Sequence, residues 1–189
     1  MTPQGLAALK TQLEQEEALM TVAYPDPDSP LAKECTRLGL PLRLYMKVPN
    51  WPALSGAPWS IAYGHTGPEV RPGMTVTPAQ AEQILADDVA KIEALLSKYE
   101  PWWSTLPDPQ ADVMVDIAFN IGVAGIMKWP RFLGFLKAGE YEQAANELAG
   151  THPWIDQVKT RGQRLVAQLR QGEHLPANWA ATQTREAMS

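Results

Sequence analysis

The feature that most restricts the fold is a stretch punctuated by proline and glycine, residues 25–58, which follows a segment with helical periodicity. Proline lacks an amide hydrogen and clashes with the preceding turn of a helix, so a regular helix cannot pass through this stretch. Before it, Thr2 and Pro3 are typical of a helix N-terminus, and leucines then recur at helical spacing. The sequence therefore predicts a helix over 2–20, followed by a region of turns and short strands.

Two segments of this middle region have the composition of strands. The sequence LRLYMKV, at 42–48, is the one clear strand candidate inside the proline-rich stretch. The sequence WSIAYGH, at 59–65, alternates well enough to be a second strand. We therefore expect a small β-containing lobe, beyond which helical periodicity returns.

The second half of the chain is mainly helical in pattern. Thr77 and Gln80 have the spacing of a capping box, and an apolar stripe continues from Ile84 to about residue 99. The sequence QADVMVDIAFNIG, which follows Asp108 and Pro109, is apolar around most of its circumference and predicts a buried helix. Shorter helices are predicted over 129–137, 140–149 and 158–171.

These patterns predict a single α+β domain, mainly α, with a small antiparallel β region in its N-terminal lobe. A cleft between two lobes would be the usual place for a site. The expected divisions are a β-containing lobe at 22–76, an interlobe helix at 77–99, a helical lobe at 100–172 together with the helix at 2–20, and a tail at 173–189.

Composition and charge exclude several classes of protein. Hydrophobic residues make up 45% of the chain and charged residues 20%, which is typical of a globular enzyme rather than a disordered chain. The net charge of −5 argues against nucleic-acid binding, although residues 128–170 carry seven basic and four acidic side chains and could meet an anionic partner. Cys35 is the single cysteine, which excludes an internal disulfide and supports no cysteine-based metal cluster, and we expect no metal site.

The N-terminal residues are too charged for the core of a signal peptide. No stretch of the chain approaches the roughly 18 consecutive apolar residues that a membrane span needs. We therefore expect synthesis in a cytoplasm without a signal peptide, and no stable membrane insertion.

One carboxylate lies within an apolar stripe. Asp88 falls close to the centre of the stripe that Ile84, Ile92 and Leu95 form on the predicted helix. Burial of an unpaired charge is costly, so a cation or several hydrogen-bond donors should meet this side chain. His65, at the end of the second predicted strand, is the natural candidate. The alternative is a solvated Asp88 at the edge of the stripe.

Acidic residues also gather where the first predicted helix gives way to the proline-rich turn. Glu16 and Glu17 both flank the apolar stripe of that helix, and Asp26 and Asp28 follow in the turn. A glutamate and an aspartate that face each other across one turn could perform acid/base hydrolysis. Helical periodicity does not choose between the two glutamates. The glutamates could equally be solvated, and the aspartates could cap their own backbone.

A resemblance to a known family selects among these residues. Glu17, then Tyr24 and Asp26, and later WSIAYGHTG resemble the phage-type lysozymes, glycoside hydrolase family 24, whose pattern is E-G, then Y-x-D, then T-I-G-Y-G-H-T. The segments TPAQAEQILADDV and VDIAFNIG resemble the interlobe helix and the buried helix of the same family. The resemblance implies a lysozyme-like two-lobed fold.

The resemblance also implies an activity, which is hydrolysis of the β-1,4 bond between N-acetylmuramic acid and N-acetylglucosamine in bacterial peptidoglycan. In this family Glu17 would be the general acid that protonates the leaving oxygen. Asp26 would stay ionised and hold the attacking water, and the Ser60 hydroxyl would help to hold it. No cofactor is implied. Such an enzyme would act as a monomer on the wall in the periplasm, after release through a holin pore.

Four more residues take roles from the resemblance. His65 and Asp88 correspond to a structural ion pair of the family, which stabilises the fold without taking part in the reaction. Asn120 and Arg161 correspond to residues that face the cleft and contact the substrate. Without the resemblance, Asn120 could be a helix cap and Arg161 a solvated side chain.

The chain departs from the family pattern in several places. Ala18, Ser60 and Ala62 replace a glycine, a threonine and a glycine. Asp26 and Ser60 lie 34 positions apart, where the best-known members have a short turn, so residues at about 29–57 form an insertion that could be a lid or an additional wall contact.

The insertion leaves open whether Asp26 or Asp28 is the second carboxylate. Two other functions also remain open. A lytic transglycosylase of the same fold needs the acid but no water, and a non-catalytic wall-binding virion protein needs neither.

Overall fold

In the computed structural model, residues 1–150 and 154–179 are described. The chain divides into two compact units. The first, which we call the small unit, is Glu17–Asp88, and the second, the helical unit, consists of Met1–Glu16 and the chain from Val89 onward. The predicted tail at 173–189 lies in part outside the described residues.

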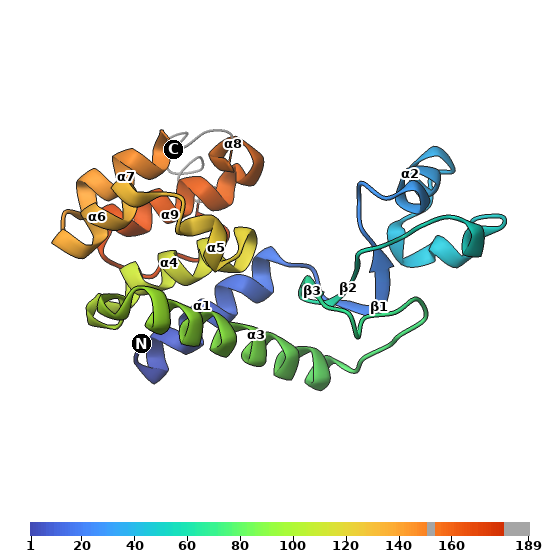
Figure 1. The fold of residues 1–189 in the computed structure, drawn as a ribbon, viewed down its shortest axis with the longest axis horizontal. Helices are drawn as coiled ribbons and strands as arrows, with labels where there is room; N and C mark the ends of the chain where they lie inside the picture. The colour runs from blue at the N-terminus through green and yellow to red at the C-terminus, as the bar shows by residue number, and fades with distance from the viewer. Residues whose placement is uncertain (151–153, 180–189) are drawn as a thin grey trace, which may run out of the picture. The chain divides into compact units, whose positions relative to one another are not determined.

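The small unit is built on an antiparallel sheet of three strands in the order β1-β2-β3 (Figure 1). Its strands are β1 (Met20–Pro25), β2 (Trp59–Ala62) and β3 (His65–Thr66). The sequence WSIAYGH was predicted to be one strand, but it forms most of a tight hairpin instead. Gly64 and Ala62 lie in the left-handed region, with φ of 81° and 58°, which reverses the chain between β2 and β3. Ala62 thus occupies a backbone conformation that favours the glycine of the family pattern.

The insertion folds into short helices around a small core of its own. They are α2 (Pro30–Arg37) and the 3-10 helices η1 (Leu42–Lys47) and η2 (Trp51–Ala53). The prediction of a strand at LRLYMKV was wrong, because Tyr45 is fully buried against Leu31, Cys35 and Val48 while its neighbours in sequence are not. Its hydroxyl accepts a hydrogen bond of 2.7 Å from the Gly73 amide, which ties the insertion to the loop after the sheet.

The helix α3 (Pro78–Tyr99) begins and ends where the sequence predicts. The capping box is confirmed, since the Thr77 amide donates to Gln80 Oε1 and the Gln80 amide donates to Thr77 Oγ1. The buried face of α3 is shifted by about one residue from the predicted apolar stripe, so the prediction of the stripe was wrong in register. Leu85 and Val89 are buried, whereas Leu95 is 41% exposed.

The helical unit packs around α4 (Asp108–Ile121), which contacts α1, α5 and α9, while α7 packs against α6 and α9 (Figure 1). The first helix, α1, is Pro3–Glu16 and ends four residues before the predicted limit, because Met20 pairs with Ala62 in the sheet. The remaining elements are η3 (Pro101–Thr105), α5 (Val123–Ile126), α6 (Pro130–Ala138), α7 (Tyr141–Ala149), α8 (Trp154–Val158) and α9 (Thr160–Gln171).

The architecture is therefore α+β and mainly α, as the sequence predicts. Among the residues described, no helix combines the length and the apolar character needed to cross a bilayer.

Candidate active site

Three hydroxyl side chains form a row across the sheet of the small unit. Tyr24 of β1 is paired with Ser60 of β2, and Ser60 is in turn paired with Thr66 of β3. Directly opposed residues of antiparallel strands project from the same face, so the three side chains lie next to each other. Ser60 Oγ is 2.7 Å from Thr66 Oγ1, and the Tyr24 hydroxyl is hydrogen-bonded to Ser60. We call Tyr24, Ser60 and Thr66 the hydroxyl row.

Glu17 lies beside this row. It is in the short segment between α1 and β1, and its Oε2 would be 3.7 Å from a Cβ built on Gly64, in the hairpin turn. Burial raises the pKa of Tyr24, and the negative charge of Glu17 raises it further. The glutamate carboxyl is therefore close enough to disfavour the phenolate, and Tyr24 keeps its hydrogen at neutral pH.

Asp26 directly follows β1, two residues after Tyr24, and side chains two apart on an extended strand point to the same side. Its Oδ1 accepts a hydrogen bond of 2.8 Å from the Asp28 amide, which holds the carboxylate in place. Asp28 is exposed and contributes a backbone donor, whereas Asp26 is half-buried. These contacts favour Asp26 over Asp28 as the second carboxylate.

The end of the insertion holds the backbone of Asp26. The Asp26 amide donates to the carbonyls of Gly56 and Pro58, each at 3.0 Å. Gly56 is buried, and a Cβ built on it would be 2.6 Å from the Trp59 ring and 3.0 Å from Pro25 Cβ. The close approach of the two segments thus depends on a glycine at position 56. The end of the insertion therefore fixes the backbone at Asp26, in addition to any role the insertion has in substrate contact.

His65 is held between two carboxylates. Its Nδ1 is 2.7 Å from Asp88 Oδ2, as the sequence predicts, and its Nε2 is 2.7 Å from Glu69 Oε1. Burial by itself would lower the pKa of His65, but hydrogen bonds to Asp88 and Glu69 and the charges of both outweigh it, so the pKa is raised. Sequence reasoning missed Glu69, because it lies in the turn after β3, where no periodic pattern relates it to His65.

We expect His65→Asn to lower the free energy of unfolding by about 1 to 3 kcal/mol at pH 6, because charge-assisted hydrogen bonds are lost. The folded pKa is raised above the ordinary value of 6.5, so this stabilisation is complete below pH 6.5 and is lost as the pH rises through the folded value. Urea unfolding of both proteins at pH 6 and pH 9 measures the difference. A difference that does not shrink at pH 9 would contradict the ion pair.

A second group of charges, the charge cluster, consists of Glu16, Asp116, Arg161 and Arg164 in the helical unit. Arg161 Nε is 2.8 Å from Glu16 Oε2 and 2.7 Å from Asp116 Oδ1. Arg164 Nη2 is 2.6 Å from Glu16 Oε1 and 2.9 Å from Asp116 Oδ2. The side chains of Asp116 and Arg164 are fully buried, and those of Glu16 and Arg161 are 10% exposed. Each charge therefore has partners of opposite sign within the cluster.

The charge cluster gives different roles to two adjacent glutamates. Burial raises the pKa of Glu16 and the charge of Asp116 raises it further, while the two arginines act in the opposite direction. Glu16 thus has a structural role in the charge cluster. Glu17, the next residue in the chain, is left as the candidate acid. The partners of Arg161 favour a structural role for this side chain as well, and its contact with substrate stays a prediction.

Asn120, the other predicted substrate contact, lies at the end of α4 and is exposed. Its Oδ1 accepts a hydrogen bond of 2.8 Å from the indole Nε1 of Trp154. This bond fixes the orientation of the amide, and Trp154 packs edge-on against Trp129 at 5.5 Å between ring centroids. Asn120 is therefore held in a defined position on the surface, which is compatible with the predicted contact.

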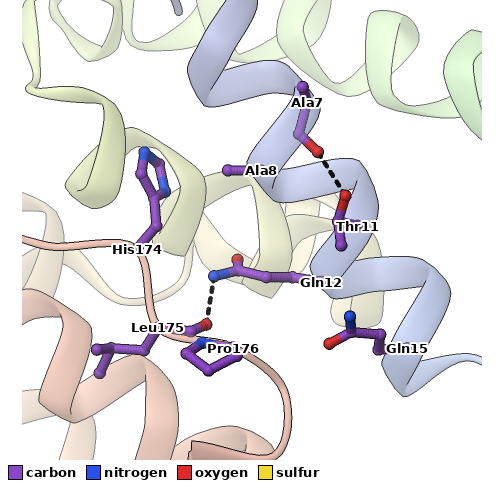
Figure 2. A pocket seen from close by; sticks show the side chains of 8 residues that line it. All are labelled: Ala7, Ala8, Thr11, Gln12, Gln15, His174, Leu175 and Pro176. Carbon is purple, nitrogen blue, oxygen red and sulfur yellow. Dashed lines mark hydrogen bonds between the residues drawn. The ribbon is translucent and has the colours of Figure 1, made fainter.

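A pocket of about 370 Å³ lies on the helical unit between α1 and the segment after α9 (Figure 2). Gln12 crosses it, and its Nε2 donates to the Leu175 carbonyl at 2.6 Å. The residues that line it are Ala7, Ala8, Thr11, Gln12, Gln15, His174, Leu175 and Pro176.

One of these lining residues, His174, contacts a buried carboxyl group: its Nδ1 is 2.7 Å from Oδ2 of Asp112. Burial, together with the charges of Asp108 and Asp116, raises the pKa of Asp112 to about 8. The pocket thus adjoins a carboxyl group that is mostly neutral at pH 7, and none of the predicted catalytic residues lines it. No group of three or more His, Cys, Asp and Glu side chains in the described ranges is arranged to hold a metal ion.

Comparisons with known proteins agree with the resemblance found in the sequence. A family model described as phage lysozyme matches residues 42–171. The chain is 33% identical to an endolysin of Bacillus phage B103 over 47% of the chain and 33% of that protein, and 32% identical to an endolysin of Bacillus phage PZA over 58% and 39%. It is 25% identical to a SAR-endolysin of Enterobacteria phage P21 over 51% of the chain and 59% of that protein.

The matches to the two Bacillus phage endolysins thus cover less than two fifths of those proteins. The match to the family begins at residue 42, inside the insertion, and so leaves out Glu17 and Asp26. The roles of these two residues rest on the motif in the sequence and on their placement beside the hydroxyl row.

Proposed function

The chain belongs to the phage lysozyme family, and from this premise we propose that it is a peptidoglycan hydrolase, an N-acetylmuramidase that lyses the wall of a bacterial host. The substrate would be the β-1,4 bond between N-acetylmuramic acid and N-acetylglucosamine. The observation that carries the proposal is the placement of one carboxyl group, Glu17, and one hydrogen-bonded carboxylate, Asp26, around the hydroxyl row.

The reaction divides between the two carboxyl groups. Glu17 donates its proton to the glycosidic oxygen as the bond to the anomeric carbon breaks, which gives the leaving sugar a hydroxyl. Asp26 accepts a proton from a water molecule as the oxygen of that water bonds to the anomeric carbon from the opposite face. The charge that develops on the sugar ring in the transition state is stabilised by the Asp26 carboxylate. The product would have an inverted anomeric centre.

Ser60 is the third participant in the proposal. Its hydroxyl lies in the middle of the hydroxyl row and one residue pair away from the end of β1, where Asp26 follows. A water molecule held by both Asp26 and Ser60 has a restricted orientation, and this converts a collision with solvent into an attack from a bound position.

A lytic transglycosylase of the same fold is the second candidate, since it needs only the acid. Hydrolysis adds one water to each cleaved bond, whereas transglycosylation leaves a 1,6-anhydro sugar that lacks it. Mass spectrometry of muropeptides from a wall digest separates the two. We expect hydrated, reducing muramic ends, and anhydro ends as the main product would refute the hydrolytic mechanism.

We propose that the enzyme acts on the wall as a monomer. It would bind no nucleic acid and would not insert stably into a membrane. Release through a holin pore would bring a protein made in the cytoplasm to the periplasm. Three of the relatives are named SAR-endolysins, so the route by which the chain reaches the wall is a separate question from its reaction.

A further inference from the structure

We propose that Thr66 is a positioning residue, which fixes the direction of the hydrogen bonds along the hydroxyl row so that Ser60 presents a lone pair, and not a hydrogen, to the attacking water. The inference rests on the proposed hydrolytic function. Neither the sequence motif nor the pairing of the strands by itself gives Thr66 a part in the reaction.

Thr66 lies at one end of the hydroxyl row. Thr66 Oγ1 donates a hydrogen bond of 3.3 Å to the carbonyl of Gly64, within the hairpin turn. A hydroxyl group has one hydrogen, so Thr66 can take part in its second bond, of 2.7 Å to Ser60, only as the acceptor. Ser60 is therefore the donor in that bond, and its single hydrogen points toward Thr66.

The other neighbour of Ser60 supplies a hydrogen. Tyr24 stays a neutral phenol at neutral pH, because burial raises its pKa. Tyr24 is hydrogen-bonded to Ser60, and since the single hydrogen of Ser60 is used toward Thr66, the Tyr24 hydroxyl must be the donor in this bond. Ser60 then uses its hydrogen toward Thr66 and one lone pair toward Tyr24. One lone pair remains, and a third partner of Ser60 must be a donor.

This order has a consequence for the bound water. A water molecule between Asp26 and Ser60 must donate one hydrogen to each, since the carboxylate is also an acceptor. Both of its hydrogens are then used, and its lone pairs are directed away from the protein, toward the anomeric carbon. In the reaction one hydrogen passes to Asp26, the other stays on the new hydroxyl of the sugar, and the oxygen forms the new bond. A Ser60 hydrogen pointing at the water would occupy one of its two lone pairs and leave one of its hydrogens unheld, so the orientation for attack would no longer be fixed.

Two substitutions at position 66 test the proposal, because one removes the hydroxyl group and the other keeps it. Thr66→Val keeps the branched shape on an exposed strand residue and removes the hydroxyl, while Thr66→Ser keeps the hydroxyl. We expect Thr66→Val to lower kcat by about 3- to 10-fold, which corresponds to one hydrogen bond, with KM unchanged. Thr66→Ser should stay within about twofold of the wild type, and thermal melting should show both variants folded.

A double-mutant cycle with Ser60→Ala shows whether Thr66 acts through Ser60. Without the Ser60 hydroxyl, Thr66→Val should have no further effect on kcat. Equal kcat values for Thr66→Val and Thr66→Ser, or additive effects of Thr66→Val and Ser60→Ala, would overturn the proposal while leaving the proposed function in place. Failure of the wild type to release hydrated muramic ends would refute both.

Discussion

Glu17→Gln is expected to lower the kcat of wall hydrolysis on the order of 10² to 10⁴-fold, because glutamine has the shape of glutamic acid but cannot donate a carboxyl proton to the leaving oxygen. The loss should be confined to kcat, since the amide can still accept and donate hydrogen bonds to the sugar. Release of reducing ends from purified walls, followed over a range of wall concentrations, measures both parameters. The fold should be kept, and thermal melting checks this.

Glu82→Gln provides the matched control for this experiment. Glu82 is exposed on α3, so its substitution changes the net charge by the same amount without touching the site. We expect wild-type rates from this variant. Wild-type rates from Glu17→Gln would remove the general acid from the proposed mechanism, and the absence of hydrolysis by the wild type itself would favour a non-catalytic wall-binding protein.

Arg164→Met should lower the free energy of unfolding by about 3 to 5 kcal/mol, the usual effect of removing one partner from a buried ion pair. Arg164 is fully buried and its guanidinium contacts both Glu16 and Asp116, so its loss leaves two carboxylates with Arg161 as the remaining cation of the cluster. Urea unfolding at neutral pH measures the change. The slope of the transition should stay the same, because the same surface is exposed on unfolding.

Arg131→Met is the control for Arg164→Met. Arg131 also forms an ion pair, at 3.2 Å from Glu147, but its side chain is 76% exposed. A pair of this kind contributes about 0 to 1 kcal/mol, since water screens it. Similar effects of the two substitutions would show that burial of the cluster contributes nothing, and would contradict the structural role assigned to Arg164.

The elements that sequence reasoning predicted best are those whose limits are set locally. The capping box at Thr77 and Gln80 consists of two hydrogen bonds within a single turn, so it can be read from four residues. The strand predicted at LRLYMKV shows the opposite case. Tyr45 is buried because Leu31, Trp51 and Trp59 surround it, and these contacts come from residues outside the seven-residue segment itself. Tertiary packing there overrides the local preference for a strand.

The site was predictable to the extent that it follows a motif. Periodicity did not separate Glu16 from Glu17, and the resemblance to a family chose the second. The structure supplies a physical reason for the difference, since Glu16 is held by Arg161 and Arg164. Thr66 was present in the quoted motif, yet its relation to Ser60 depends on a strand register that the sequence does not state.

The two ends of the insertion are joined at the strand edge, where the Asp26 amide donates to the Gly56 and Pro58 carbonyls and the Leu31 amide donates to the Ser55 carbonyl. A segment that leaves and rejoins a sheet at one point can be gained or lost in a single genetic event without displacing the strands on either side. Changes of length or sequence within the insertion, away from these hydrogen bonds, should therefore leave the strands on either side in place.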